Sequence, residues 1–168
     1  MNLQFKSVFT EETDFQSQQK NLKPGMPDIT ITTQGVLNLL RVIDEKKAVG
    51  PDDLSPRVLK ELAEILADPI TTIYQKSLEQ ERIPKDWLSA RVVPTYKKKG
   101  ERYDCENYRP ISITCILCKV MEHIVSSHIR KHLHINNILY PLQHGFRSKR
   151  SYESQLLEFT HDIAKKHG

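Results

Sequence analysis

Apolar residues recur along much of the chain at the spacing of amphipathic helices. One such segment has apolar side chains at i, i+3, i+4 and i+7, and Thr32 or Thr33 can cap it. A further helix is predicted to begin at Ser55-Pro56, where serine provides a cap and proline loses no hydrogen bond at the first helical position. Asp68-Pro69 repeats this start signal, so we expect two short helices with a break at 67–69. The apolar positions of the first helix are Val36, Leu39, Leu40 and Ile43.

Two short segments have the pattern of β-strands. Residues 90–96 are β-branched and apolar, and residues 108–114 alternate isoleucine with serine and threonine. Pro94 lacks an N–H, which predicts an edge strand or a hairpin arm. The segment between the two strands is polar and contains Gly100. The simplest assembly is therefore a β-hairpin with a long, basic tip.

Two more helices are predicted after the hairpin. Residues 115–134 carry a continuous apolar stripe, and Ser151 can cap a last helix. Residues 1–30 show no long periodic pattern and contain two prolines and a glycine, which predicts an extended arm or linker. The fold class is therefore α+β, mostly helical with one β-hairpin, and so small a sheet looks incomplete. The last helix is expected to turn these side chains toward the core: Leu156, Leu157, Phe159 and Ile163.

Composition narrows the class of protein. Hydrophobic residues make up 38% of the 168 residues, enough for a core, and no apolar run reaches the ~18–20 residues that span a bilayer. The N-terminal segment lacks the basic flank and apolar centre of a secretory signal. Cys105, Cys115 and Cys118 are an odd number of cysteines, which argues against a disulfide framework. We therefore expect an intracellular protein, cytoplasmic or nuclear, that has no membrane partner and is not secreted.

Positive charge is concentrated in one part of the chain. Residues 91–150 hold 12 basic and 4 acidic side chains, a local excess of +8, whereas residues 1–84 hold 10 basic and 13 acidic side chains. A basic block of this kind indicates a polyanionic partner, with nucleic acid first among the candidates. The alternative is that the cations only solvate helix faces, and charge alone leaves both interpretations open.

The hairpin tip is the first candidate site. Lys97, Lys98 and Lys99 precede Gly100, and Arg109 begins the returning strand, so a tight hairpin would bring Arg109 near the lysines. Ammonium groups provide point charge and a guanidinium group provides bidentate hydrogen bonds, a combination that suits polyphosphate. The alternative is a solvated loop that binds no ligand.

The loop at 143–150 is the second candidate site. Gly145 permits a positive φ or a close approach of the backbone. Phe146 can stack on a base while the cations contact phosphates. The alternative is that Phe146 is buried and the cations only solvate the loop. The predicted binding residues of this site are Gln143, Gly145, Phe146, Arg147, Lys149 and Arg150, and the loop also contains His144.

Metal sites and nucleophilic catalysis have little support. Cys115 and Cys118 have no second pair at zinc-finger spacing, and no glutamate follows His128 as a zincin motif requires. The sequence contains no G-x-S-x-G, no P-loop and no G-x-G-x-x-G. We therefore expect no metal ligands and no resident cofactor in this chain.

Six segments together resemble the reverse transcriptases of non-LTR retrotransposons, and the jockey-like group in particular. They are FKSVFTEE (5–12), KAVGPDDL (47–54), RVVPTYKKKG (91–100), NYRPIS (107–112), CKVMEHI (118–124) and QHGFRSKRS (143–151). Each segment alone is a weak signal, but all six follow the order and spacing of the family. The resemblance implies part of a right-hand polymerase: residues 1–30 form a linker arm, and residues 31–168 form the fingers and enter the edge of the palm.

The resemblance also implies partners for the two candidate sites. Lys97 or Lys98 and Arg109 fall where the family's cations contact the nucleotide triphosphate. Gly145, Phe146 and Arg147 match a segment that lines the template and nucleotide pocket. The implied partners are an RNA or DNA template-primer and a nucleotide, and the intact family enzyme uses Mg²⁺.

The family's catalytic aspartates have no counterpart in this sequence. Such polymerases hold two metal ions through palm carboxylates, and two of these belong to a Y/F-x-D-D hairpin. No Y/F-x-D-D occurs here, and the sequence ends at Gly168 before the position of the first aspartate. We therefore expect a polymerase fragment that is inactive alone, with its palm-facing surface exposed and prone to self-association. The alternatives are a non-catalytic nucleic-acid-binding module and a plain interaction protein whose basic block is incidental.

Overall fold

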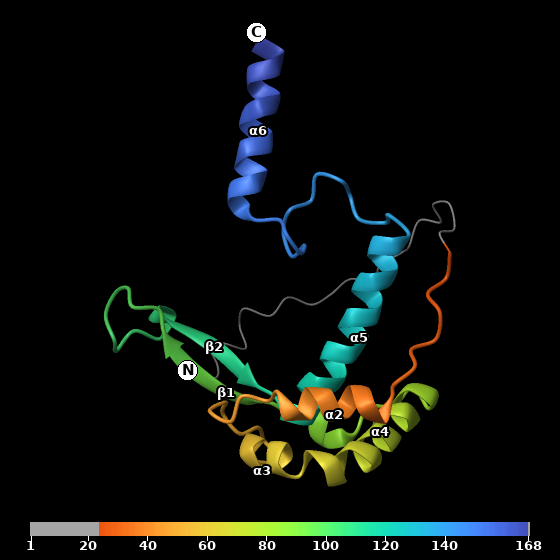
Figure 1. Ribbon diagram of the computed structural model, residues 1–168. Helices are drawn as coiled ribbons and strands as arrows, with labels where there is room; N and C mark the ends of the chain where they lie inside the picture. Colours follow the sequence, from red (N-terminus) through yellow and green to blue (C-terminus); the bar gives the residue numbers. More distant parts are fainter. Residues whose placement is uncertain (1–23, 168) are drawn as a thin grey trace. The chain divides into compact units, whose positions relative to one another are not determined.

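A computed structural model describes residues 24–167 of the chain (Figure 1). These residues form two compact units, of which the first is Pro27–Ser127 and the second runs from His128 onward together with residues 24–26. The predicted arm lies largely outside the described residues, as does the 5–12 segment, and residues 24–30 form neither helix nor strand. None of the helices in the described part of the chain is long and apolar enough to cross a bilayer.

Five α-helices and one antiparallel hairpin make up the described secondary structure, in agreement with the predicted α+β class. The helices are α2 (Thr33–Arg41), α3 (Pro56–Glu61), α4 (Ala63–Glu79), α5 (Ile116–Ile135) and α6 (Tyr152–His167). The strands are β1 (Arg91–Tyr96) and β2 (Tyr108–Ile113), and two short 3-10 turns, η1 (Lys85–Leu88) and η2 (Cys105–Asn107), precede them.

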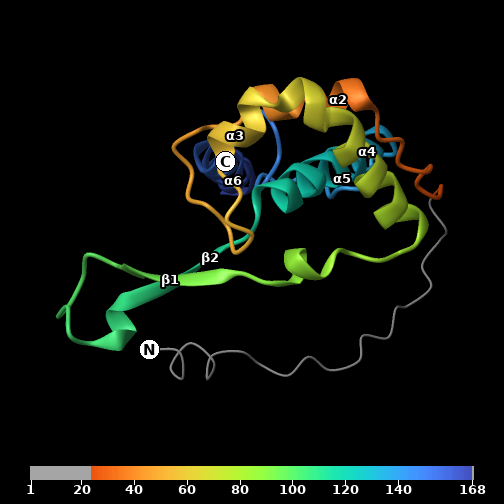
Figure 2. The same ribbon diagram turned by 90° about the horizontal axis from the view of Figure 1, so that it is seen from below.

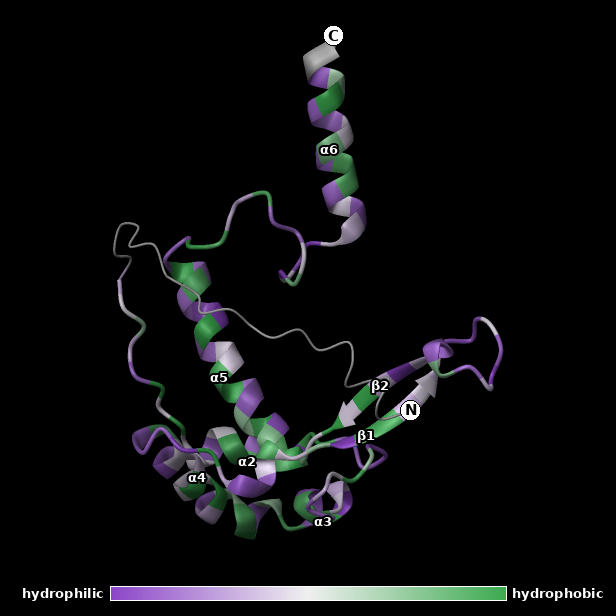
Figure 3. Cartoon of the chain, turned by 180° about the vertical axis from the view of Figure 1, so that it is seen from behind, coloured by the Kyte–Doolittle hydropathy of each residue, from purple (hydrophilic) through white to green (hydrophobic). Residues whose placement is uncertain are grey.

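The hydrophobic core of the first unit lies between α2, α4 and the first half of α5. Val36 and Leu40 on α2 are fully buried, as the helical spacing predicts, and α2 packs against α4. Apolar and polar residues alternate around α4 and α5, so each helix has an apolar side for this core (Figure 3). Tyr74 is buried at the centre and its hydroxyl donates to the Leu117 carbonyl over 2.7 Å, which satisfies the polar atom that burial removes from water.

The helix starts predicted at Thr32 and Ser55 are both observed, but only one has a side-chain cap. Thr32 Oγ1 accepts a hydrogen bond from the Gly35 N–H over 3.1 Å, an interaction worth about 1 kcal/mol. Ser55 precedes Pro56 in an extended conformation, yet its hydroxyl makes no capping bond. The start at Pro56 therefore rests on the proline, whose missing N–H would have no helical partner there.

The predicted break at 67–69 is wrong. The chain bends instead at Leu62, between α3 and α4, and Pro69 lies in the interior of α4. An internal proline costs about 3 kcal/mol, but a break would pull Ile70 and Tyr74 out of the core. Burying a side chain such as that of Ile70 is worth about 1.5–3 kcal/mol, so the burial of the two side chains together outweighs the cost of the proline.

The predicted hairpin is confirmed, and its register explains how it accommodates two prolines. Pro94 is opposite Pro110, and the Lys97 N–H donates to the Asn107 carbonyl over 2.7 Å just beyond the strands. Hydrogen-bonded and non-hydrogen-bonded pairs alternate along an antiparallel ladder, so the proline pair falls at a non-hydrogen-bonded position. The missing N–H groups would point outward, so the ladder loses no bond and each edge lacks one donor. Figures 1 and 2 show the hairpin extending away from the helices of its unit.

The apolar face expected on the last helix forms, but it is not turned toward a core. Ser151 caps α6 as predicted, since its hydroxyl accepts from the Ser154 N–H over 3.3 Å. Leu157 and Phe159 are 71% and 61% exposed, and Leu156 and Ile163 are exposed as well. Helical spacing predicts which side chains share a face, whereas burial also needs a partner surface, and the described residues supply none for this face. The α5 stripe is likewise buried only as far as Ile124.

Candidate nucleic-acid interface

The hairpin tip is held in shape by its own hydrogen bonds. The Tyr96 hydroxyl donates to the Gly100 carbonyl, and the Tyr108 hydroxyl donates to the Arg102 carbonyl over 2.8 Å. The two tyrosine rings, opposite each other in the register, lie 5.6 Å apart between centroids, and the Arg102 guanidinium lies 5.5 Å from the Tyr96 ring. A loop with this many internal contacts presents its remaining side chains in a defined arrangement.

Two residues with positive φ make the turn at the tip. Lys98 has φ 58° and Gly100 has φ 76°. A side chain at Gly100 would also bring its Cβ within 2.5 Å of the Asn107 side chain. Asn107 Nδ2 donates to the Glu101 carbonyl over 2.9 Å, which holds the two sides of the tip together.

The predicted cations of the hairpin fall into two groups. Arg109 is opposite Thr95, and Lys97 follows Thr95 by two residues, just beyond β1 where it still pairs with Asn107, so Arg109 and Lys97 share one face of the hairpin. Lys97 Nζ donates to the Glu106 carbonyl over 2.6 Å, whereas Lys98 projects from the turn. Within the described residues, the side chains of Lys98, Lys99 and Arg109 are exposed and make no hydrogen bond or ion pair. None of the four cationic side chains of the tip forms an ion pair with a described carboxylate, although Glu101, Asp104 and Glu106 belong to the same tip.

The second candidate site, the loop at 143–150, exposes its aromatic residue completely. Phe146 has a relative exposure of 106%, so the alternative in which its ring is buried is wrong. Phe146 and Lys149 have φ 59° and 61°, in the left-handed region that costs such residues roughly 1–2 kcal/mol each. The expectation for Gly145 is also wrong: its φ is not positive, and an added Cβ would meet nothing within 4 Å. The left-handed turn falls one residue later, on the phenylalanine.

Two arginines of this loop donate hydrogen bonds to backbone carbonyls of the segment just before it. Arg147 Nη1 donates to the Tyr140 carbonyl over 3.2 Å, and Arg150 Nη1 donates to the Pro141 carbonyl. Gln143 Nε2 donates to the Gly145 carbonyl over 3.3 Å. Carbonyl acceptors are neutral, so both guanidinium groups are positioned without loss of their charge. The arrangement is suited to an anionic ligand.

His144 is the residue of the loop whose importance the sequence did not reveal. It is buried, with 7% exposure, and its Nδ1 and Nε2 lie 2.6 Å from Ser154 Oγ and Glu158 Oε2. Both partners are on the first two turns of α6, so the imidazole ties the loop to this helix. The four-residue spacing of Ser154 and Glu158 was visible in the sequence, but nothing there connected it to a histidine ten residues earlier.

The two thiols at the start of α5 are held in their protonated form. Cys115 is buried, and its Sγ accepts a hydrogen bond from the Cys118 N–H over 3.3 Å. Burial raises the pKa of Cys115, and burial together with the nearby Glu122 raises the pKa of Cys118 to about 12. Thiolate is the form that binds metals and attacks electrophiles, so neither thiol is activated. The described residues contain no group of three histidine, cysteine or acidic side chains arranged to hold a metal ion.

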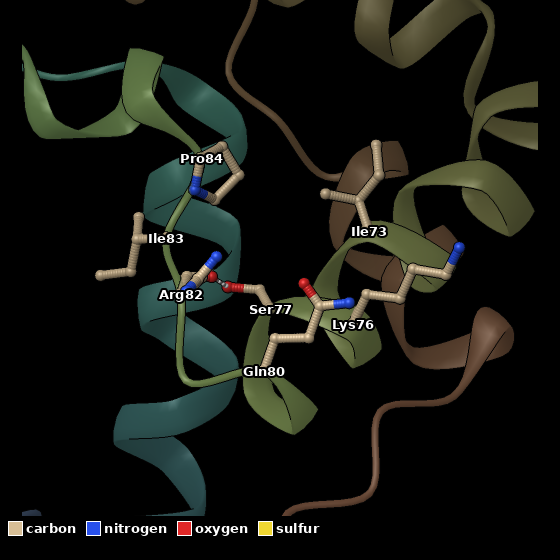
Figure 4. Close-up of a pocket in the computed structure, with 7 residues that line it drawn as sticks. All are labelled: Ile73, Lys76, Ser77, Gln80, Arg82, Ile83 and Pro84. Atoms are coloured by element: carbon tan, nitrogen blue, oxygen red, sulfur yellow. Dashed lines mark hydrogen bonds between the residues drawn. The ribbon is translucent and has the colours of Figure 1, made fainter.

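A small pocket lies at the end of α4, and none of the predicted site residues lines it (Figure 4). Its volume is about 270 Å³, and Ile73, Ile83 and Pro84 supply its apolar surface. Ser77 Oγ donates to the Arg82 carbonyl over 2.6 Å and closes the turn beside it. No acidic or nucleophilic pair lines this pocket, so it offers binding space without catalytic groups.

Comparison with known proteins relates the whole chain to polymerases of mobile elements. The chain is 28% identical over 132 residues to the RNA-directed DNA polymerase from mobile element jockey of Drosophila melanogaster. It is 25% identical over 162 residues to the probable RNA-directed DNA polymerase from transposon BS of the same organism. It is also 25% identical over 141 residues to the jockey polymerase of Drosophila funebris. These relatives support the reverse transcriptase family.

These matches cover most of this chain but only a small part of each relative. They cover 79%, 96% and 84% of this chain, but only 14%, 18% and 15% of the relatives. The chain therefore corresponds to less than a fifth of a reverse transcriptase of this kind. No family model matches it.

Proposed function

We propose that this chain is a piece of a non-LTR retrotransposon reverse transcriptase that contributes the fingers. In this proposal residues 31–168 form the N-terminal fingers and the edge of the palm, and residues 1–30 form a linker arm. The observation that carries the proposal is the match to the BS polymerase over 96% of the chain, since it includes both candidate sites. The confirmed hairpin and the defined geometry of both cationic loops support it.

In this function the hairpin tip contacts the triphosphate of the incoming nucleotide. Lys97 and Arg109 on one face, with Lys98 in the turn, supply three positive charges on an internally held loop. A preorganised set of cations binds phosphate without the entropic cost of ordering the loop first. The guanidinium group adds the bidentate geometry that phosphate oxygens accept.

The loop at 143–150 contacts template in the same proposal. The exposed Phe146 ring offers a stacking surface for a base, and Arg147 and Arg150 keep their full charge for phosphates. Lys149 adds an exposed cation, while Gln143 and Gly145 join in a hydrogen bond within the loop. Single-stranded nucleic acid is recognised by this combination of aromatic faces and backbone cations.

Polymerisation itself needs groups that these 168 residues do not include. The intact family enzyme uses Mg²⁺ held by palm carboxylates, and this sequence contains no Y/F-x-D-D. We therefore expect the purified chain, given primer-template, deoxynucleotides and Mg²⁺, to extend no primer. Templated synthesis by the chain alone would contradict this part of the proposal.

A salt titration of binding to single-stranded RNA tests whether the hairpin cations bind phosphate groups, with the RNA backbone in the place of the triphosphate. We compare the chain with the triple variant Lys97→Ala, Lys98→Ala, Arg109→Ala by fluorescence anisotropy. Each lost phosphate contact lowers the slope of log K against log salt by about 0.7 for single strands, so the variant should lose about 2. The matched control is Lys46→Ala, Lys47→Ala, Arg57→Ala, which removes the same charge from exposed positions elsewhere in the first unit.

The outcomes separate the remaining interpretations. The affinity for RNA could be weak and could stay the same at every salt concentration and in the hairpin variant. That result would mean that the basic block is incidental, as in a plain interaction protein. Equal losses of affinity and of salt slope in the two triple variants would mean that binding depends on the net positive charge of the chain and not on the hairpin cations in particular. A non-catalytic nucleic-acid-binding module stays the second candidate, because cations positioned by neutral carbonyls suit a phosphate backbone whether or not a nucleotide is bound.

A further inference from the structure

The imidazole of His144 connects two groups at the start of α6, the Ser154 hydroxyl and the Glu158 carboxylate. Ser151 and Ser154 cap each other, since each hydroxyl accepts a hydrogen bond from the backbone N–H of the other residue. His144 adds to this box by placing Nδ1 2.6 Å from Ser154 Oγ, and its Nε2 reaches Glu158 Oε2 one turn further on, also over 2.6 Å. A carboxylate oxygen accepts only, so the proton of this second bond is on Nε2.

The other side of the loop is held to the chain that precedes it. Arg147 and Arg150 donate to the carbonyls of Tyr140 and Pro141. Phe146 lies between these two anchors, next to Arg147 and two residues after His144. The backbone on both sides of the phenylalanine is thus fixed by side chains that are themselves hydrogen-bonded.

Phe146 combines two unfavourable features. Its ring is fully exposed to water, and its φ of 59° is left-handed without being a glycine. A strained, non-glycine conformation persists only when surrounding contacts determine it, and such residues concentrate at ligand-contacting positions. The His144–Ser154–Glu158 network supplies contacts of that kind from within the same unit.

We propose that His144 is a positioning residue that holds Phe146 ready to stack on a base of single-stranded nucleic acid. The inference rests on the proposed role of the 143–150 loop. The loop is ordered before the ligand arrives, so binding does not have to spend free energy on fixing the left-handed turn. His144 itself touches no ligand, and its effect on binding passes entirely through Phe146.

A double-mutant cycle tests this dependence. Binding of a fluorescein-labelled single-stranded RNA is measured for the full chain, Phe146→Ala, His144→Ala and the double variant. Base–aromatic stacking corresponds to a loss of about 5- to 150-fold in affinity when the ring is removed. We expect His144→Ala to weaken binding by a smaller factor, and the double variant to bind as Phe146→Ala does. The salt slope should stay unchanged throughout, because no phosphate contact is removed.

Companion variants separate positioning from loss of structure. Glu158→Ala should weaken binding in the direction of His144→Ala, whereas Glu158→Gln, which keeps an oxygen acceptor, should restore it. His161→Ala is the matched control, since His161 is an exposed histidine on α6 outside the network. Thermal melts of each variant show whether the chain has kept its fold, and the Glu158 pair tests the network even where His144→Ala unfolds.

Each outcome has a distinct meaning. Losses from His144→Ala and Phe146→Ala that simply add, or a changed salt slope, would overturn the positioning role and leave the loop as a binding site. Normal binding by His144→Ala would do the same. Normal binding by Phe146→Ala would overturn both the positioning role and the loop's proposed role, while the hairpin triple variant would still report on the first candidate site.

Discussion

At the scale of single residues, a few close contacts fix the backbone. Gly50 makes one of them against backbone atoms, because an added Cβ would lie 2.6 Å from Cys115 Cα and 2.9 Å from Cys115 N. Both neighbours are backbone atoms at the start of α5, so no side chain can move aside. The turn at Gly50 thereby places the segment before α3 against the helix that follows the hairpin.

Substitution of Gly50 by alanine should therefore destabilise the chain. We expect a loss of about 1–3 kcal/mol in the free energy of unfolding, the usual cost of overpacking a fixed backbone. Urea denaturation followed by circular dichroism measures it. Gly145→Ala is the control, because an added Cβ there meets nothing within 4 Å. Equal stability of the two variants would contradict the close contact.

The Cys118 thiol makes a second residue-scale prediction, about alkaline pH. Its pKa is about 12 in the folded chain against an ordinary value of 9.0, so the unfolded chain releases this proton first. The resulting stabilisation is complete below about pH 9 and is lost as the pH rises toward 12. Unfolding curves at several pH values should show that wild type loses more stability above pH 9 than Cys118→Ala does. A difference between the two proteins that is constant with pH would contradict the assignment.

At the scale of elements, the local residue pattern determines where some helices and strands begin and end, and packing against the core determines others. The β-branched, apolar run at 90–96 and the alternation at 108–114 were sufficient to predict the hairpin, because strand pairing needs only the two segments and their turn. The spacing around Val36 and Leu40 predicted α2 and its buried face for a similar reason. Asp68-Pro69 carries an equally clear start signal, yet α4 runs through it because the core keeps Ile70 buried.

Replacing Pro69 should remove the energetic cost of a proline inside α4. We expect Pro69→Ala to raise the free energy of unfolding by about 1–3 kcal/mol, since the helix regains one hydrogen bond and loses a steric clash. Thermal or urea unfolding provides the measurement. Pro56→Ala, at the first position of α3, should bring no gain because no helical bond is missing there. Destabilisation by Pro69→Ala would mean that α4 depends on the proline.

The sequence predicted some features of the candidate sites and could not predict others. The cations of the hairpin follow from residue type and turn position, whereas the sequence left open whether Phe146 is exposed or buried. The His144 network joins residues 10 and 14 positions apart in a geometry that no sequence period encodes. The same limit explains the error at Gly145. Residue type shows which positions tolerate a left-handed turn, but hydrogen bonds across the loop determine which position adopts it.

At the scale of the whole molecule, the chain covers less than a fifth of its polymerase relatives and exposes an apolar face on α6. Exposed apolar area of this kind favours association, so we expect self-association that increases with concentration. Sedimentation equilibrium of Leu157→Lys, Phe159→Lys against wild type tests it, with Ile65→Lys, an exposed position on α4, as control. A monomeric wild type with a single cooperative melt would contradict the prediction.

Photo-crosslinking to a 4-thiouridine-labelled single-stranded RNA, followed by mass spectrometry of the crosslinked peptides, tests the central claim most directly. The claim is that nucleic acid contacts the hairpin tip and the 143–150 loop. We predict crosslinks within residues 97–109 and 143–150, lost at high salt and reduced at the second segment in Phe146→Ala. Crosslinks confined to other segments such as α2 and α4, or spread evenly along the chain, would contradict the claim.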